Sequence, residues 1–400
     1  MQAISGGAVV ATPRIGMALL PIVGAVFVAY LAIGLALPVL PLQVHQGLGF
    51  GAFVVGLVVG SQFVAALFSR VWAGHHADRR GAKCAVVAGL LAAAASGLLY
   101  LLSLVFAGQP WVSVAVLLLG RALFGGAESF IITGAVTWGL ALAGPKNAGR
   151  VIAWIGMAMF AALAFGAPFG TALYSVGGFG AVALATILVP LATVSLVAPL
   201  SPVPMQHGPR PSLSAVVGTV WMPGIGSALS SIGFGAIVAF SSLLAIERSW
   251  APVWLPFSAF AVALVAARSI FGHVPDRLGG ARVAVVCVLI EAAGLALIWL
   301  APGLASAGVG AALAGFGYAL VYPALGVEAV RRAPPQSRGL AMRAYTAFLD
   351  VALGFGSPAL GLVAKMAGLG AVFLASAATV LCATAVALAL LVAKPPRMSL

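Results

Sequence analysis

The sequence predicts an all-α membrane protein with twelve transmembrane helices, arranged as two six-helix bundles that repeat each other in parallel. Hydrophobic residues make up 63% of its 400 residues and charged residues only 7%, with a mean hydropathy of +1.17. A soluble domain carries about a quarter charged residues, so the solvent for most of this chain must be lipid. The apolar residues form continuous runs of about 20 or more, the length that an α-helix needs to cross a bilayer.

The apolar runs give the expected spans in chain order. In the first half they cover residues 15–40, 51–73, 84–106, 112–142, 150–173 and 179–199. In the second half they cover residues 216–246, 253–271, 283–301, 306–330, 339–364 and 370–392. A Pro-rich polar stretch lies between the halves, so we predict an N-terminal bundle over 1–199, a cytoplasmic linker over 200–214 and a C-terminal bundle over 215–400. The first run is too long for a signal peptide and lacks a small-residue cleavage site, so we expect it to remain as a span.

The basic residues predict the orientation. With a cytoplasmic N-terminus, most Lys and Arg residues, Arg70 among them, fall at the cytoplasmic ends and loops, and only Arg248 and Lys365 fall on the opposite side. The positive-inside rule therefore predicts a multi-pass protein of the bacterial inner membrane with both termini cytoplasmic. This distribution also accounts for the net charge of +13 without a nucleic-acid partner. All three cysteines lie in apolar runs and all five histidines in loops, so we expect no disulfide framework, metal site or cofactor.

Two shifts of the sequence align its halves. A shift of 198 residues places Arg70 on Arg268, Gly74 on Gly272, Asp78 on Asp276, Arg79 on Arg277 and Gly81 on Gly279. A shift of 190 residues places Gly149 on Gly339, Gly166 on Gly356 and Pro168 on Pro358. Many secondary transporters are built from such parallel six-span repeats, with the substrate site near the bilayer midplane between them.

Four motifs carry a resemblance to a known family. The stretch Gly74–Lys83 resembles a signature of the loop between spans two and three, although His75 and His76 depart from it. The ending Pro38–Pro41 resembles a first-span signature of twelve-span exporters, and Arg121–Glu128 a fourth-span arginine motif with Phe124 in place of the usual Gln. The run Gly156–Gly170 is similar to a degraded fifth-span antiporter signature. Over essentially its whole length, the chain resembles the major facilitator superfamily.

A narrower resemblance rests on three short runs. Gly126–Phe130, Trp138-Gly139 and Pro145–Gly149 are similar to the YhhS/YfcJ-type group of bacterial inner-membrane facilitators, often labelled arabinose-efflux-like. The substrates of that group are poorly defined, so this resemblance adds little about the cargo.

The repeated charged stretch is expected to be a conformational gate. In a tight, Gly-bounded turn, an Asp side chain caps a neighbouring helix and pairs with nearby Arg. The resemblance implies that this turn latches the halves together when the transporter opens outward; the alternative is a positive-inside turn without a conformational role. Glu328 is a candidate to pair with Arg268 or Arg277. The gate residues are Gly74, Asp78, Arg79 and Gly81 in the first half and Arg268, Gly272, Asp276, Arg277 and Glu328 in the second.

Arg121 and Glu128 are the first candidates for proton coupling. They lie seven residues apart in span four, so they share a helix face about 10 Å apart. An unpaired charge at the bilayer centre costs about 2.5–3.5 kcal/mol even on the lenient scale, so both should face the bundle interior. Glu128 would carry the proton while Arg121 tunes it or holds an anionic group; the alternative is a structural ion pair.

Arg343 and Asp350 repeat this spacing in span eleven. The shift of 190 residues aligns them with Ala153 and Phe160, so these charges break the symmetry of the repeat. A coupled transporter needs such asymmetry, because one half must respond to a proton or ligand differently from the other. Asp350 is therefore the second candidate for proton coupling, and a structural pair with Arg343 or another helix is the alternative.

The substrate cavity is expected between spans one, four, seven and ten. Its candidate residues, each of which packing would also explain, are Tyr30, Gln62, Trp138, Trp154, Ser230, Phe234, Tyr318, Tyr322 and Tyr345. Glu291 lies in span nine, which the resemblance makes a peripheral helix, so a buried structural carboxylate is expected there.

The predicted function is proton-coupled efflux of a drug, sugar or metabolite by alternating access. The expected working unit is a monomer embedded in the bilayer. Proton-coupled uptake of a metabolite is the alternative. A membrane enzyme would need a nucleophile or metal cluster at membrane depth, and a sensor would normally carry a soluble domain. The sequence has no nucleotide-binding Gly-rich Lys motif, which argues against ATP-driven pumping.

Overall fold

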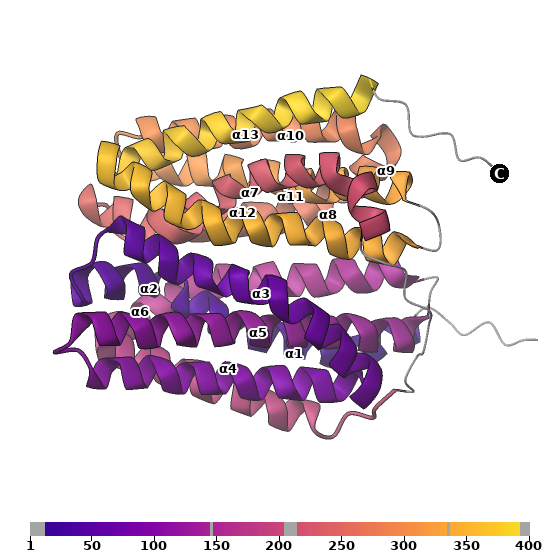
Figure 1. The fold of residues 1–400 in the computed structure, drawn as a ribbon, viewed down its shortest axis with the longest axis horizontal. Helices are drawn as coiled ribbons and strands as arrows, with labels where there is room; N and C mark the ends of the chain where they lie inside the picture. The colour runs from indigo at the N-terminus through magenta and orange to yellow at the C-terminus, as the bar shows by residue number, and fades with distance from the viewer. Residues whose placement is uncertain (1–12, 145–146, 204–213, 334–336, 393–400) are drawn as a thin grey trace, which may run out of the picture.

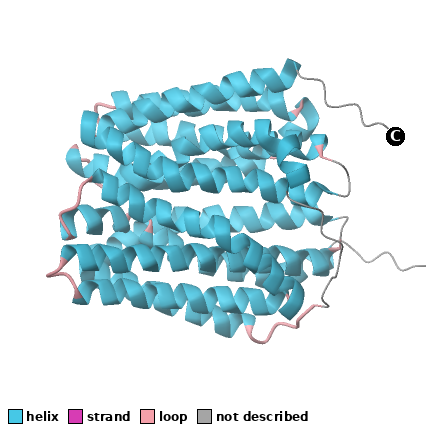
Figure 2. Cartoon of the chain, viewed as in Figure 1, coloured by secondary structure: helices cyan, strands magenta, loops and turns pink. Residues whose placement is uncertain are grey.

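The computed structural model describes residues 13–144, 147–203, 214–333 and 337–392, and its regular structure in these ranges is entirely helical (Figure 2). Both termini and most of the expected linker, residues 204–213, lie outside the described ranges. The expectation that both termini are cytoplasmic therefore stays a prediction, as do the boundaries of the linker.

The first half of the chain forms the elements α1 to α6. Their bounds are α1 Pro13–Ala36, α2 Val39–Leu42, η1 Gln43–Gly47, α3 Ala52–Arg80, α4 Ala82–Val105, α5 Pro110–Ala143 and α6 Ala148–Val197. The short elements α2 and η1 (a π-helical turn) continue the path of α1 beyond Ala36. Gly178 has φ 61° and ψ −164°, so it divides the 50-residue α6 into two successive spans.

The second half forms α7 to α13. Their bounds are α7 Ser214–Glu247, α8 Leu255–Phe271, α9 Val274–Leu278, α10 Gly280–Leu300, α11 Leu304–Arg332, α12 Arg338–Ala367 and α13 Leu369–Val392. Ten of the described helices are long and apolar enough to span a membrane. With the second span of α6 and the shorter apolar helix α8, the predicted twelve-helix membrane fold is confirmed.

The helices gather into two groups that follow the chain (Figure 1). In the first half, α1 packs against α6, and α5 against α3 and α4; in the second, α10 packs against α11 and α13, and α7 against α12. The two largest interfaces between the groups are those of α3 with α12 and of α6 with α8, and α7 also contacts α2 and α3. Any charged side chain shared by the two halves is therefore expected at one of these interfaces.

The repeated glycines mark the same backbone position in both halves. Gly81 precedes α4 with φ 93° and ψ 153°, and Gly279 precedes α10 with φ 92° and ψ 135°. This left-handed region favours glycine, which explains why both copies keep it.

The expected tight turn over Gly74–Lys83 is wrong for most of that stretch. Helix α3 runs on to Arg80, and the chain turns only at Gly81. No helix breaker follows Gly74 before that point, and Arg79 and Arg80 suit the negative C-terminal end of a helix. In the second half α8 ends at Phe271 and the short helix α9 follows.

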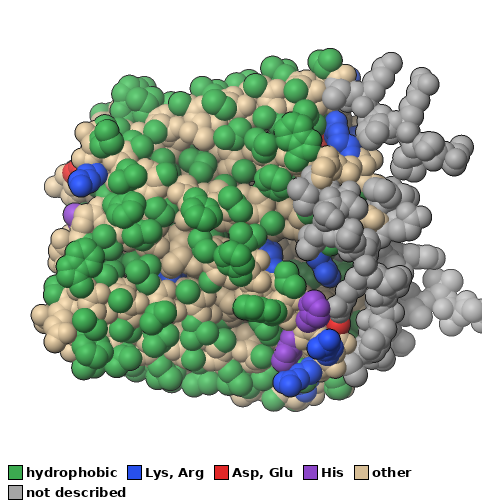
Figure 3. Space-filling model, in the orientation of Figure 1, with side chains coloured by type: hydrophobic (Ala, Val, Ile, Leu, Met, Phe, Trp, Pro, Cys, Tyr) green, Lys and Arg blue, Asp and Glu red, His purple; other side chains and the backbone are tan. Residues whose placement is uncertain are grey.

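The two ends of the molecule differ in charge and packing. Apolar side chains are spread over the whole face in Figure 3, and Lys and Arg side chains gather towards one end. At the end with few charges, residues 32–44 and 233–245 are buried throughout. These stretches belong to the α1–η1 segment and to α7. Towards the other end of the molecule, where the charges gather, Leu20 of α1 and Trp221 of α7 are exposed. The halves are thus packed together at the end with few charges.

Glycines allow α10 and α11 to touch along their backbones. A Cβ on Gly294 would collide with backbone atoms of Gly310 and Ala314, whereas a Cβ on Gly24 in α1 would meet nothing within 4 Å. We therefore expect Gly294→Leu to lower the apparent thermal midpoint by about 3 °C or more, because overpacking forces the backbones apart. Fluorescence-detected size-exclusion chromatography after heating measures this midpoint. Gly24→Leu is the matched control, and an equal loss in both variants would contradict this packing role.

Candidate functional site

An ion pair between Arg70 and Asp350 joins the two halves. Arg70 Nε lies 2.6 Å from Asp350 Oδ2 and Nη2 lies 2.8 Å from Oδ1, which is the bidentate geometry of a strong charge-assisted pair. The Asp350 side chain is 1% exposed and that of Arg70 is 33% exposed. The pair links α3 to α12 across 280 residues of sequence.

Helix geometry places this pair well inside both helices, away from their ends. Arg70 lies 18 residues beyond Ala52, about 27 Å along α3, and Asp350 lies 17 residues before Ala367, about 26 Å along α12. Arg70 therefore lies inside α3 and not at its end, while its expected place towards the cytoplasmic side stays a prediction. The apolar run of the sequence ends soon after Arg70, but the helix continues for ten residues beyond it.

Glu128 forms the second part of the site, on α5. Its Oε1 accepts a hydrogen bond of 3.1 Å from the Tyr30 hydroxyl, and its Oε2 accepts one of 2.6 Å from Gln62 Nε2. Glu128 is only partly buried and lies within electrostatic range of both Arg70 and Asp350. The structure thus brings two cavity candidates and two coupling candidates into one group of charges.

Tyr322 on α11 lies within electrostatic range of an arginine from each half, Arg70 and Arg268. Its hydroxyl is 2.8 Å from Thr346 Oγ1, and its carbonyl accepts a 2.7 Å hydrogen bond from the Tyr345 hydroxyl. Tyr322 therefore connects the ion pair to the other interface.

Arg268 lies at the interface between α8 and α6. Its guanidinium carbon is 5.3 Å from the centre of the Phe160 ring, and Nη2 donates a 3.3 Å hydrogen bond to the carbonyl of Ala319. The expected pairing of Glu328 with Arg268 or Arg277 is wrong, because Glu328 pairs with Arg332 at 2.6 Å. Glu328 also lies 3.8 Å from Arg331 and accepts a hydrogen bond from the amide of Ala281, at the start of α10.

The two interfaces are therefore related copies with different chemistry. Arg70 and Arg268 occupy equivalent positions under the shift of 198 residues, and Asp350 and Phe160 under the shift of 190. Where Arg70 meets a carboxylate, Arg268 meets an aromatic face. The sequence predicted that Asp350 breaks the symmetry, but it did not identify Arg70 as the partner.

Neither expected pair within a single helix forms. Arg121 is fully buried, and its Nη1 lies 3.4 Å from the Tyr100 hydroxyl, while its Nε and Nη2 lack a hydrogen-bond partner in the described structure. Arg121 therefore faces α4, whereas Glu128 is held by α1 and α3. Arg343 is exposed, and its Nη1 lies 3.9 Å from the place of a Cβ on Gly74.

A second group of cavity candidates lies within the C-terminal half. Ser230 donates a 2.5 Å hydrogen bond to Glu291, which is fully buried and reaches from α10 to α7. The Phe234 ring stacks on Tyr318 with centroids 5.3 Å apart, and on Phe260 with centroids 5.6 Å apart. These contacts give Ser230, Phe234 and Tyr318 clear packing roles.

The remaining predicted residues lie elsewhere. Trp138 is buried in α5 with an indole nitrogen that has no hydrogen-bond partner among the described residues, and Trp154 is half-buried in α6. Asp78 is half-buried and engaged in an interaction, whereas Arg79 is exposed at the end of α3. Gly272, Asp276 and Arg277 are exposed around α9.

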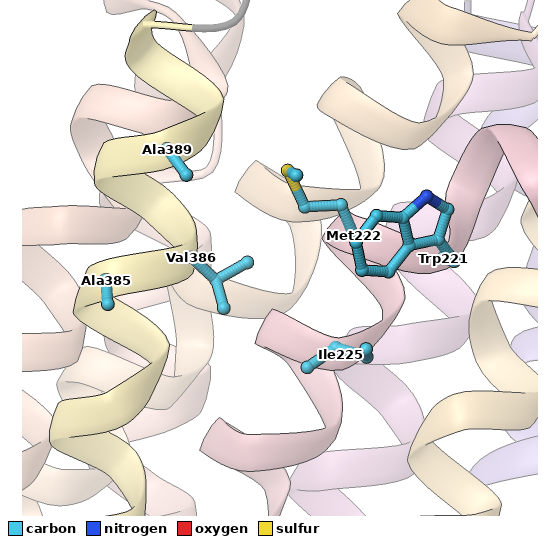
Figure 4. Close-up of a pocket in the computed structure, with 6 residues that line it drawn as sticks. All are labelled: Trp221, Met222, Ile225, Ala385, Val386 and Ala389. Carbon is cyan, nitrogen blue, oxygen red and sulfur yellow. The ribbon is translucent and has the colours of Figure 1, made fainter.

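The pocket in Figure 4 is separate from these charges. Residues of α7 and α13 line it, and all of them are apolar: Trp221, Met222, Ile225, Ala385, Val386 and Ala389. Its lining offers no charged group for a polar cargo, so the candidate site remains the group around Arg70, Glu128 and Asp350.

A charge exchange tests the pair between the halves. We expect Arg70→Asp and Asp350→Arg each to lower the apparent thermal midpoint strongly, because breaking a buried ion pair costs about 3–5 kcal/mol. The double variant, which restores opposite charges, should recover at least about half of that loss. Arg79→Asp, on the exposed end of the same helix, is the control. Losses in the double variant that equal the sum of the single losses would refute the pairing.

Comparison with known proteins agrees with this architecture. The family model described as Major Facilitator Superfamily matches residues 22–257 and 224–400. An uncharacterised MFS-type transporter of Salmonella typhimurium (strain LT2) is 43% identical over 362 residues, covering 90% of this chain and 93% of that protein. One of Burkholderia mallei (strain SAVP1) is 44% identical over 361 residues, covering 89% of this chain and 88% of its own.

Solved structures show the same fold at low sequence identity. A D-xylose-proton symporter superimposes with a TM-score of 0.77 at 15% identity, covering 94% of this chain and 96% of that one. The nucleoside transporter NupG superimposes with a TM-score of 0.68 at 15% identity, covering 94% of this chain and 100% of that one. The chain therefore belongs to the major facilitator superfamily and is a secondary transporter, not an enzyme.

Proposed function

We propose that this transporter couples the efflux of a small molecule to the entry of protons, and that Asp350 is the group that binds the proton. The observation that carries this proposal is the ion pair of Asp350 with Arg70 between the two halves. A carboxylate in this place ties proton binding to the contact that alternating access must break.

The coupling step follows from the charges. Protonation of Asp350 removes its negative charge and weakens its bond to Arg70. Arg70 is then left without its partner in a partly buried place, where an unpaired charge is costly, and Glu128 is the next carboxylate within electrostatic range. A proton thereby shifts the attraction of Arg70 from the opposite half to its own half and favours separation of α3 from α12.

The packing around the ion pair supports a role in gating. Beyond it, towards the end with few charges, backbone atoms of α3 and α12 meet at Gly56 with Ser357 and at Gly361 with Ala52. Opening of this interface would have to separate both the glycine contacts and the ion pair. The ion pair is the part of this contact that a proton can weaken.

The direction of transport rests on the sequence motifs. The Pro38–Pro41 ending and the Gly156–Gly170 run favour efflux. Gly166 and Gly170 also pack α6 against Gly34 and Leu35 of α1, so part of this run has a structural role. Proton-coupled uptake of a metabolite is the alternative.

The narrower placement of the chain also rests on sequence runs. Gly126–Phe130 and Trp138-Gly139 favour the YhhS/YfcJ-type, arabinose-efflux-like subgroup as its place in the family. We propose the bacterial inner membrane as the location and a monomer as the working unit.

A reconstituted assay tests the coupling. Proteoliposomes that contain a trapped pH-sensitive dye receive drugs, sugars and metabolites from outside at equal pH. An antiporter exchanges the entering compound for protons and makes the lumen alkaline, whereas a symporter makes it acid. We expect an alkaline shift in the wild type and a loss of about tenfold or more in Asp350→Asn. Glu128→Gln should show a smaller loss.

Counterflow of labelled compound without a pH gradient is the control for folding and binding. We expect Asp350→Asn to keep counterflow while it loses coupled proton movement. Proton movement that is undiminished in both variants would exclude Asp350 and Glu128 as coupling groups, and an acid shift would replace efflux by uptake.

A further inference from the structure

Arg268 is a half-buried cation in the last turn of α8, at the interface with α6. In the described parts of the chain, its guanidinium contacts the Phe160 ring and the carbonyl of Ala319. No acidic residue in those parts forms an ion pair with it. A cation–π contact and one carbonyl offset only part of the cost of removing such a charge from water.

The acidic residues inside α5, α10 and α12 are engaged elsewhere. Asp350 binds Arg70, Glu128 accepts hydrogen bonds from Tyr30 and Gln62, and Glu291 accepts one from Ser230. Of the two equivalent arginines, Arg268 is therefore the one without a carboxylate partner, because the position opposite it holds Phe160. The equivalent position in the other interface holds Asp350.

The surroundings of Arg268 suit a bound anion. Tyr318, Tyr322 and Tyr345 all lie within electrostatic range of the guanidinium. Their hydroxyls are polar groups in an otherwise apolar region, and Tyr322 connects them to Arg70 and Asp350. An anion at Arg268 would thus act on a tyrosine that also lies within electrostatic range of Asp350.

We infer that Arg268 binds a carboxylate group of the cargo. This carboxylate would pair with Arg268 as Asp350 pairs with Arg70 in the other interface. This inference rests on the proposed transport site and adds its substrate class: an organic carboxylate. The guanidinium offers two parallel N–H groups to a carboxylate, and the bound anion completes the interface between α8 and α6.

The sharpest test supplies the missing carboxylate from the protein itself. Phe160→Asp places an acidic side chain opposite Arg268, so that it competes with a bound carboxylate. Purified protein is titrated with benzoate and succinate, with benzamide and succinamide as the neutral counterparts, and binding is followed by isothermal titration calorimetry and by the apparent thermal midpoint. We expect the wild type to bind at least one of the two anions and neither amide.

The variants separate charge from shape. Phe160→Asp should weaken binding of the anion by at least about tenfold, because its own carboxylate neutralises Arg268. Phe160→Asn has nearly the same shape without the charge and should lose far less affinity. Arg268→Gln should also lose at least about tenfold, which keeps the test valid if the Asp variant fails to fold. Arg282→Gln, at an exposed position near the start of α10, is the control for net charge.

The outcomes bear on this inference alone. Binding of neither anion to the wild type, equal binding of the anions and their amides, or equal weakening by Phe160→Asp and Phe160→Asn would overturn it. The titrations need no pH gradient, so their failure leaves the proton coupling of Asp350 standing. Loss of coupling in Asp350→Asn likewise leaves the binding of carboxylates at Arg268 to be judged by these titrations.

Discussion

The cost of a charge inside the membrane is the constraint on which this structure depends. Arg70 and Asp350 meet that cost together, and to do so they must come from different halves of the chain. The pair therefore ties the position of α12 to that of α3 and makes the contact between the halves sensitive to charge. Glycines at the same interface bring the backbones close. The interface therefore combines uncharged glycine contacts with an ion pair whose strength depends on the charge of Asp350.

Much of the fold could be predicted because it depends on composition and order. Runs of apolar residues mark the spans, and the repeat of Gly81 as Gly279 marks a backbone position that favours glycine in both halves. The prediction of a tight turn over the gate stretch was wrong, because the hydropathy falls at Gly74 while the helix continues to Arg80. Hydropathy reports where lipid ends, whereas the end of a helix depends on the next residue that leaves helical geometry.

The candidate site could be predicted only in part. Glu128, Asp350, Tyr30 and Gln62 stand out because polar residues are rare in apolar spans, and the structure brings them together. Their partners could not be deduced, since spacing along one helix suggested Arg121 and Arg343. The actual partner of Asp350 depends on how α3 crosses α12, which lies far away in the sequence. The alignment of the two halves could have singled out Arg70, because it places Arg70 and Arg268 at equivalent positions.

The two arginines show how a symmetric scaffold acquires two different responses. An ion pair such as Arg70 with Asp350 weakens when the carboxylate takes up a proton, whereas the contact of Arg268 with Phe160 contains no group that titrates near neutral pH. In the proposed mechanism the first interface responds to protons, and the second responds to an anion that neutralises its arginine. Because Tyr322 lies within electrostatic range of both arginines, a change of charge at one interface alters the field at the other. In the proposed mechanism, coupling between proton and cargo therefore requires no direct contact between them, because Tyr322 lies within electrostatic range of both interfaces.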